Sequence, residues 1–337
     1  MLVDASLDGA IETIGDQATA AEADGYDGVW VAEVARDPFL PLVTAAERTD
    51  RVTLGTSIAV AFARNPMTLA VVANDLQRAS AGRFVLGLGS QIQPHIEKRF
   101  SMPWSHPAAR MRELIEAMRA IWACWNDGVP LQFNGTYYRH TLMTPFFNPG
   151  VNPYGAPAVY LGAVGPKMTA VAGAVADGLF VHPFTTRRYL DEVTLPALDS
   201  ALAQAGRDRA AITVCLPAFV VTGDDTDQIA AATARTKQQI AFYASTPAYR
   251  RVLDLHGWGE LQPRLNALSK QGKWIEMAEA IDDEVLNTFA AVGDPDGVAA
   301  ELHARYDGIV DRLSFATQDG SGVPASLITA LRGLTAV

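Results

Sequence analysis

The sequence predicts an α/β protein whose eight parallel strands close into a barrel surrounded by helices, the (β/α)8 or TIM barrel. β-Prone segments alternate with helical segments along the whole chain of 337 residues, and this alternation is typical of parallel sheets. Several strands are apolar almost throughout, as expected when both faces of a sheet are covered. No internal repeat, low-complexity tract or interdomain linker interrupts the alternation. An open, doubly wound sheet has the same alternation and is the alternative.

The first half of the chain contains four strand–helix units. Gly25 follows an Ala-rich amphipathic stretch and is a typical helix end. Pro66 stands in the first turn of the third helix, where proline is favoured. The predicted strands are residues 2–5, 26–34, 51–62 and 83–89, and the predicted helices are residues 7–24, 41–49, 66–80 and 107–125. The loop after the fourth strand, at about residues 90–107, is long enough to be an insertion.

The second half of the chain contains four further strands and two further insertions. The predicted strands are residues 157–163, 178–182, 211–223 and 311–317. Asn134-Gly135 lies between β-prone flanks and predicts a hairpin within an insertion at about residues 126–157. The stretch 225–305 between strands seven and eight is too long for one crossover, which indicates added helices at about residues 246–290. We therefore expect one TIM-barrel domain over residues 1–337 with these insertions.

Composition and charge argue against several classes of protein. The formal net charge is −10 and the basic residues are scattered, which argues against a nucleic-acid-binding surface. Cys124 and Cys215 form no CxxC pair, and the histidines show no HExxH spacing, so we expect no disulfide framework and no metal site. The N-terminus lacks a signal-peptide pattern, and no apolar run reaches about 20 residues. The sequence thus predicts a cytoplasmic protein without a membrane span.

In a TIM barrel, the chemistry takes place at the carboxyl ends of the strands, so the residues that follow each strand are candidates. The turn after the fifth strand, AVGPKM at residues 163–168, opens a helix. Unpaired N–H groups at a helix N-terminus and a nearby lysine suit a phosphate group. Tight packing of the turn is the alternative, because Gly-Pro also opens helices for conformational reasons alone. His182, Arg187 and Arg188 follow the sixth strand.

Three segments together resemble one family. They are VTLGTSIAVAFARNP at residues 52–66, GRFVLGLGSQ at residues 82–91 and LGAVGPKMTAVAGAVADG at residues 161–178. Their order and spacing are similar to those of the luciferase-like flavin and deazaflavin oxidoreductases, and the similarity covers nearly the whole chain. The third segment most resembles the branch that uses the deazaflavin coenzyme F420, which includes methylenetetrahydromethanopterin reductases.

The resemblance implies which residues bind the cofactor. The backbone of the turn after the fifth strand would hold the cofactor phosphate. The third strand would end in a bulge near Ala59-Val60 against the cofactor ring, where relatives often have a non-prolyl cis peptide. The cofactor-binding residues implied in this way are Ala59, Val60, Ala61, Arg64, Gly89, Ser90, Gln91, Val164, Gly165, Pro166, Lys167 and Met168.

The resemblance also suggests residues for proton transfer. Glu33 occupies the position where F420 enzymes place an acidic residue or a histidine near the ring, and an exposed loop glutamate is the alternative. Ile92 stands where one type of F420 dehydrogenase has a proton-donating glutamate. His95 and Glu97 follow about one turn later and are the substitute candidates, since either group can exchange protons near neutral pH when its environment is tuned.

The leading interpretation is an F420-dependent oxidoreductase that transfers a hydride between carbon 5 of the deazaflavin and a small organic substrate. A luciferase-like monooxygenase that uses FMN is the first alternative, and a non-catalytic protein that binds flavin or F420 is the second. The resemblance also implies a homodimer. Aromatic residues on the insertions are candidates for an apolar lid over the substrate: Trp104, Phe146, Phe147 and Tyr154.

Overall fold

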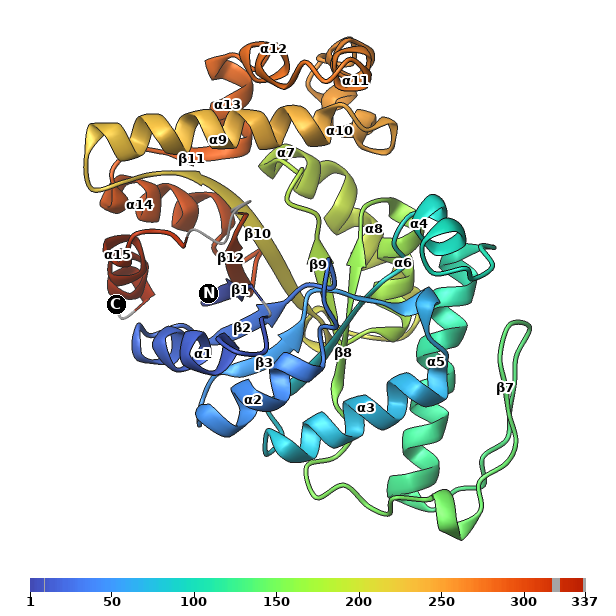
Figure 1. The fold of residues 1–337 in the computed structure, drawn as a ribbon. Coiled ribbons are helices and arrows are strands. Elements are labelled where there is room, and N and C mark those ends of the chain that lie inside the picture. The colour runs from blue at the N-terminus through green and yellow to red at the C-terminus, as the bar shows by residue number, and fades with distance from the viewer. Residues whose placement is uncertain (9, 317–321, 336–337) are drawn as a thin grey trace. The chain divides into compact units, whose positions relative to one another are not determined.

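The computed structural model describes residues 1–8, 10–316 and 322–335. Its main sheet has the strand order β11-β10-β12-β1-β2-β3-β5-β8-β9, and β10 also pairs with β9, so the sheet closes into a barrel (Figure 1). The strand pairs are parallel. These observations confirm the predicted TIM barrel. The last residue of the predicted strand 311–317 lies outside the described residues.

The barrel strands lie where the sequence predicted them. They are β1 (Leu2–Leu7), β2 (Gly28–Val31), β3 (Thr53–Thr56) with β4 (Ala59–Val60), β5 (Phe84–Gly89), β8 (Ala158–Ala163), β9 (Gly178–Val181), β10 (Thr213–Val221) and β12 (Arg312–Phe315). A further strand, β11 (Ala290–Val292), pairs with β10. It was not predicted, because three residues directly after a helix carry no strand pattern of their own.

The helices follow the strands in alternation. They are α1 (Ile14–Ala23), α2 (Leu40–Arg48), α3 (Pro66–Ala79), α4 (Gln93–Lys98), α5 (Pro107–Asp127), α6 (Pro166–Val175), α7 (Arg187–Tyr189), α8 (Leu195–Gln204), α9 (Thr226–Ala244), α10 (Arg250–Leu255), α11 (Leu261–Lys270), α12 (Trp274–Glu279), α13 (Asp283–Phe289), α14 (Pro295–Tyr306) and α15 (Ala325–Thr335). The predicted start of the first helix, at residue 7, was wrong, because pairing with the sheet holds β1 extended through Leu7. No described helix combines the length and apolar character that a bilayer crossing requires.

The chain divides into two compact units, which we name by their place in the sequence. The N-terminal unit comprises residues 6–180 and 197–213. The C-terminal unit comprises residues 1–5, 181–196 and 214–337, as far as these are described.

In the N-terminal unit, the strands β2, β3, β5 and β8 are consecutive neighbours, and β3 meets β5 at Leu54↔Phe84. The helices α1, α2, α3 and α5 lie outside these strands (Figure 1). They turn fully buried aliphatic side chains inward, such as Leu42, Leu69 and Ile115. Burial of this kind is the main stabilising term of a fold.

The insertion at residues 126–157 contains the predicted hairpin. Its strands are β6 (Phe133–Asn134) and β7 (Arg139–His140), which pair antiparallel. The carboxylate of Glu113 on α5 accepts the N–H groups of the hairpin turn, which are those of Thr136, Tyr137 and Tyr138. The hairpin is therefore fastened to α5 by backbone groups.

In the C-terminal unit, β12 pairs with both β1 and β10. Arg312 on β12 forms a buried bidentate ion pair with Asp4 on β1, at 2.8 Å for Nε–Oδ2 and 2.6 Å for Nη2–Oδ1. The insertion at residues 246–290 contains the helices α10 to α13, as the length of this stretch predicted. Helix α9 packs with α11 and α12 (Figure 1).

Candidate cofactor-binding site

The third barrel strand is interrupted near its carboxyl end. β3 ends at Thr56, β4 begins at Ala59, and the peptide bond between Ser57 and Ile58 is cis. The interruption therefore begins two residues before the Ala59-Val60 position that the resemblance implied.

Two glycines on β5 make room for the interruption. A Cβ atom on Gly87 would lie 1.8 Å from the carbonyl oxygen of Thr56, and one on Gly89 would lie 2.7 Å from Cδ1 of Ile58. Both distances are far below van der Waals contact. A side chain at Gly87 would displace the backbone of the third strand, and one at Gly89 would displace the side chain of Ile58. The Thr56 hydroxyl also donates to the carbonyl oxygen of Gly87 at 2.6 Å and accepts from its N–H at 3.0 Å.

Glu33, which follows β2, braces the backbone beyond the interruption. Its Oε2 accepts from the N–H of Val60 at 2.7 Å and pairs with Nη1 of Arg64 at 2.6 Å. Its own N–H donates to the carbonyl oxygen of Ile58 at 3.1 Å. The side chain is only 7% exposed, so the exposed-glutamate alternative was wrong. Oε1 of Glu33 has no hydrogen-bond partner among the described residues.

Arg64 connects this brace to the loop after β2. Its Nη2 lies 3.3 Å from Oδ2 of Asp37, and its guanidinium carbon lies 5.2 Å from the centroid of the Phe39 ring. Nη1 also donates to the carbonyl oxygen of Val60 at 3.2 Å. The charge of Arg64 is therefore shared by two carboxylates of its own chain, which leaves it poorly suited to hold an anionic cofactor tail.

The residues that the resemblance placed against the ring are buried. Ala59, Val60 and Ala61 have no exposed surface, whereas Ser57 and Ile58 are partly exposed. At the interruption, Ser57 and Ile58 are therefore accessible to a ligand, and the three residues that follow them are not.

The turn between β8 and α6 begins a helix that has no side-chain cap. Gly165 is the N-cap of α6. A Cβ atom on Gly165 would meet nothing within 4 Å, and its φ of −123° is accessible to any residue. Neither packing nor conformation requires glycine here, so the tight-packing alternative was wrong. Val164 and Lys167 are exposed beside it, while Pro166 and Met168 belong to the first turn of α6.

The loop after β5 carries the other candidates for proton transfer on the surface. Ser90 is partly exposed, and its hydroxyl donates to the carbonyl oxygen of Gln91 at 3.1 Å. His95 and Glu97 are exposed on α4. Among the described residues, no hydrogen bond joins either of them to Glu33. The structure thus separates Glu33, which braces the backbone, from His95 and Glu97, which lie on the exposed surface of α4.

The four aromatic residues predicted to form a lid differ from one another in their contacts and exposure. The ring of Trp104 lies 5.7 Å from that of Phe62, which follows β4. Phe146 and Phe147 contact each other at 5.2 Å and are 90% and 71% exposed. Tyr154 is also exposed. Trp104 therefore lies beside the interrupted strand, while the other three show no contact with it among the described residues.

The arginines that follow β9, in the C-terminal unit, are paired. Nε of Arg187 lies 2.8 Å from Oδ2 of Asp191, and Nε of Arg188 lies 2.7 Å from Oε1 of Glu192. Both pairs are about half exposed, so they contribute little to stability. Neither arginine is a free cation for a phosphate.

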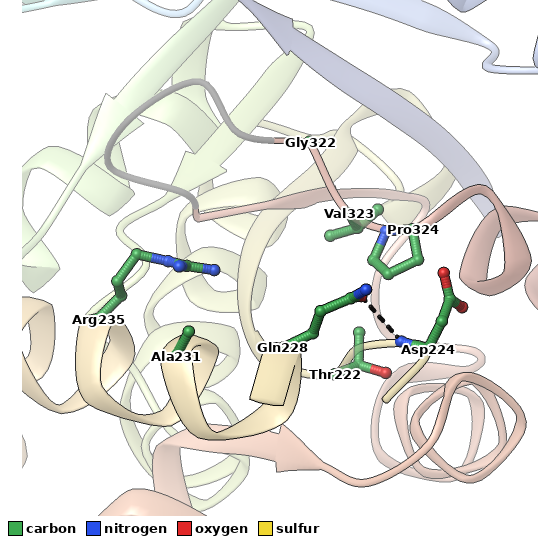
Figure 2. Close-up of a pocket in the computed structure, with 8 residues that line it drawn as sticks. All are labelled: Thr222, Asp224, Gln228, Ala231, Arg235, Gly322, Val323 and Pro324. Atoms are coloured by element: carbon green, nitrogen blue, oxygen red, sulfur yellow. Dashed lines mark hydrogen bonds between the residues drawn. The ribbon is translucent and has the colours of Figure 1, made fainter. Parts of the chain in front are cut away.

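A groove of about 390 Å³ lies at the end of β10 (Figure 2). It is lined by Thr222, Asp224, Gln228, Ala231, Arg235, Gly322, Val323 and Pro324. The N–H of Asp224 donates to Oε1 of Gln228 at 3.0 Å, and Arg235 is exposed. No aromatic side chain lines the groove, although cofactor sites are mostly apolar and aromatic, so we do not place the cofactor ring there. The described residues contain no cluster of His, Cys, Asp or Glu that could hold a metal ion.

The chain matches the model of one protein family over residues 3–312, and that family is described as luciferase-like monooxygenase. The chain belongs to this family. A Mycobacterium tuberculosis relative named "putative coenzyme F420-dependent oxidoreductase" is 32% identical over 84% of this chain and 84% of its own length. An "uncharacterized protein" of the same species is 54% identical over 92% of each chain.

Two solved structures share the fold. The coenzyme F420-dependent tetrahydromethanopterin reductase from Methanopyrus kandleri superposes with a TM-score of 0.78 at 21% identity, covering 98% of this chain and 96% of that one. The EDTA monooxygenase from Chelativorans has a TM-score of 0.70 at 16% identity, covering 100% and 93%. The family and its relatives support an oxidoreductase or monooxygenase of the luciferase-like class that uses F420 or a flavin.

Proposed function

We propose that this luciferase-like protein is an F420-dependent oxidoreductase that transfers a hydride between carbon 5 of the deazaflavin and a small organic substrate. The observation that carries the proposal is the open helix start at Gly165, where the described chain supplies neither a cap nor a packing neighbour. A helix N-terminus left in this state suits the phosphate that F420 and FMN share. The relative named for F420 dependence favours F420.

In this proposal, different residues of the N-terminal unit bind the phosphate and the ring of the cofactor. Within the turn at residues 164–168, the backbone N–H groups of Gly165 and Lys167 bind the phosphate, and the Lys167 side chain adds a positive charge. Pro166 has no N–H, and that of Met168 donates to the carbonyl oxygen of Gly165. Ser57 and Ile58 support the ring, because they are the partly exposed residues at the interruption of the strand. The bound deazaflavin supplies the hydride chemistry. Glu33 is a positioning residue that holds Val60 in place, and His95 and Glu97 stay the candidates for proton transfer.

FMN is the second candidate cofactor, and the family's description as monooxygenases favours it. The same turn would hold the FMN phosphate, so the two candidates differ in the ring and not in the anchor. A non-catalytic protein that binds either cofactor is the third candidate.

The test is an anaerobic titration of the purified protein with F420 and with FMN in one buffer, followed by absorbance and fluorescence. We expect F420 to bind more tightly. Binding of FMN at tenfold lower Kd would replace the proposal with the monooxygenase, and saturable binding of neither cofactor would overturn both. Turnover by the F420-loaded protein separates the enzyme from a non-catalytic binder.

We also propose that the chain is one barrel domain that works as a cytoplasmic homodimer. The expectation of a dimer comes from the family resemblance alone. Light scattering after size exclusion tests it, with an expected mass of twice 36.1 kDa.

A further inference from the structure

His182 and Tyr249 form a hydrogen-bonded pair within the C-terminal unit. His182 directly follows β9, and Tyr249 belongs to the short helical turn Pro247–Tyr249 in the insertion before β11. The hydroxyl oxygen of Tyr249 lies 3.0 Å from Nε2 of His182, and the two rings stack with their centroids 4.4 Å apart. Tyr243 meets the imidazole edge-on at 4.9 Å. The imidazole is thus held between two phenol rings.

The second ring nitrogen of His182 fixes its tautomer. The N–H of Phe184 donates to Nδ1 at 3.0 Å, so Nδ1 carries no proton. Burial lowers the pKa of His182 to about 4, which keeps the ring neutral near pH 7. A neutral imidazole with a bare Nδ1 carries its proton on Nε2. Nε2 is therefore the donor of this bond, and the hydroxyl oxygen of Tyr249 is the acceptor.

The hydroxyl hydrogen of Tyr249 consequently has no acceptor within this pair. Among the described residues, no hydrogen bond joins this hydroxyl to any side chain other than His182, whose Nε2 is the donor. Burial raises the pKa of Tyr249 to about 12, so the phenol keeps its hydrogen. Tyr249 is partly exposed, and polar groups of folded proteins nearly always have a partner in the protein or in water. The partner of this donor is thus outside the described chain.

The loop that carries His182 is fixed to the insertion at two further points. The Thr186 hydroxyl lies 2.9 Å from Nε2 of His256. Nη1 of Arg188 donates to the carbonyl oxygen of Leu255 at 2.9 Å. Figure 1 shows α7 and α10, which carry or adjoin these residues, next to each other. Such cross-links hold a donor in one direction, as a binding site requires.

We propose that Tyr249 donates a hydrogen bond to an oxygen atom of a small molecule bound at the carboxyl end of β9, and that His182 is the positioning residue that directs this donor. The ligand class is a compound with a carbonyl, hydroxyl or carboxylate oxygen. The proposal does not depend on the proposed function, because it assigns the compound only by this chemical class. The insertion before β11 then supplies a specificity-determining residue to the strand end.

The first test reads the tautomer in solution. NMR of the protein labelled with ¹⁵N-histidine, with the His182 signal assigned through His182→Gln, measures protonation at each ring nitrogen. We expect a neutral ring protonated on Nε2 between about pH 6 and pH 8. A proton on Nδ1 would overturn the proposal, because Nε2 would then be an acceptor and the Tyr249 hydroxyl would donate its hydrogen bond to it.

The second test locates the acceptor. Crystals of the cofactor-free protein are compared before and after soaking in acetone, a minimal carbonyl probe. We expect a water oxygen, replaced by the acetone oxygen, within roughly 2.5–3.0 Å of the Tyr249 hydroxyl. Tyr249→Phe should lose both, while the matched control Tyr243→Phe should keep both. A protein acceptor for the hydroxyl, or apolar atoms on every side of it, would overturn the proposal.

These readouts do not depend on F420 or FMN. If neither cofactor binds but the Nε2 tautomer and the acetone site are observed, the proposed function fails and the donor stands. If F420 binds but Tyr249 donates to a protein atom, the donor fails and the proposed function stands.

Discussion

Two strand-to-helix turns in the N-terminal unit differ in how their polar groups are satisfied. The turn after β4 leads into α3 and the turn after β8 leads into α6, and both helices begin with a proline. In the first turn, Oδ1 of Asn65 accepts from the N–H of Thr68 at 3.0 Å, and the Thr68 hydroxyl accepts from the N–H of Asn65 at 3.4 Å. In the second turn, Gly165 offers no side chain, and no side chain caps the helix.

The difference indicates what each turn is for. The turn after β4 is satisfied by its own chain, through Glu33 behind the strand and the Asn65–Thr68 capping box in front of the helix. In the proposed function, the turn after β4 therefore contributes the shape of its backbone to the cofactor site and no free hydrogen-bond donor. In the turn after β8, Pro166 has no N–H and the N–H of Met168 donates to the carbonyl oxygen of Gly165 at 3.0 Å, so the N–H of Lys167 is the one left open in the first turn of α6. Gly165 leaves the space before the helix open. In the proposed function, this turn contributes hydrogen-bond donors.

The largest expected effect comes from removing the brace of the first turn. Glu33→Ala takes away the acceptor of the Val60 N–H and a partner of Arg64, so we expect the free energy of unfolding to fall by roughly 2–3 kcal/mol. Urea denaturation measures it. Glu33→Gln keeps an acceptor for Val60 and should lose less. The control Asp37→Ala removes the more exposed partner of Arg64 and should cost under about 1 kcal/mol. Equal losses for Glu33→Ala and Asp37→Ala would contradict the brace.

The next effect concerns binding at the second turn. Gly165→Val fills the open space before α6, so we expect the affinity for F420 to fall tenfold or more, about 1.4 kcal/mol. Unfolding should change little, because a Cβ atom at this position meets no other atom within 4 Å. Calorimetry and thermal unfolding on the same preparation measure the two quantities. Unchanged affinity in a folded variant would remove the phosphate from this turn.

The sequence predicted the features of this comparison that depend on neighbouring residues. The alternation of strands and helices predicted the barrel, and Gly165-Pro166 predicted the open helix start. The position of the interruption was not predictable in this way, because it depends on space left by Gly87 and Gly89 some 30 positions later in the chain.

Side-chain contacts between residues far apart in the chain also could not be predicted from the sequence. The hydrogen bond between Glu33 and Val60 spans 27 positions, and that between His182 and Tyr249 spans 67. The sequence therefore indicated either an exposed loop glutamate or an acid near the ring at Glu33, whereas in the fold this side chain braces the backbone at Val60. Nothing local to Tyr249 marks it, and only the folded insertion brings it to the end of β9.

A smaller effect comes from exchanging the caps of the two helices. Asn65→Ala removes the capping box of α3 and should lower the free energy of unfolding by about 1 kcal/mol while F420 affinity stays within about twofold. Gly165→Asn installs a cap on α6 and should raise stability by a few tenths of a kcal/mol while weakening F420 binding, because the new side chain takes the N–H groups of the turn. A Gly165→Asn variant that binds as well as the wild type would show that these donors are not used.

The smallest expected effect concerns Lys167, an exposed cation in the first turn of α6. A positive charge at a helix N-terminus opposes the helix dipole and costs a few tenths of a kcal/mol, so Lys167→Met should slightly raise stability. If the charge serves an anionic ligand, the same variant should bind F420 about twofold to fourfold more weakly, roughly 0.4–0.8 kcal/mol. That difference should shrink as salt shortens the screening length from about 10 Å at 0.1 M to about 3 Å at 1 M. The control Lys270→Met, at the exposed end of α11, should leave affinity unchanged at every salt concentration. A loss of affinity that is independent of salt would mean that Lys167 acts through packing, and the turn would then bind its anion with backbone donors alone.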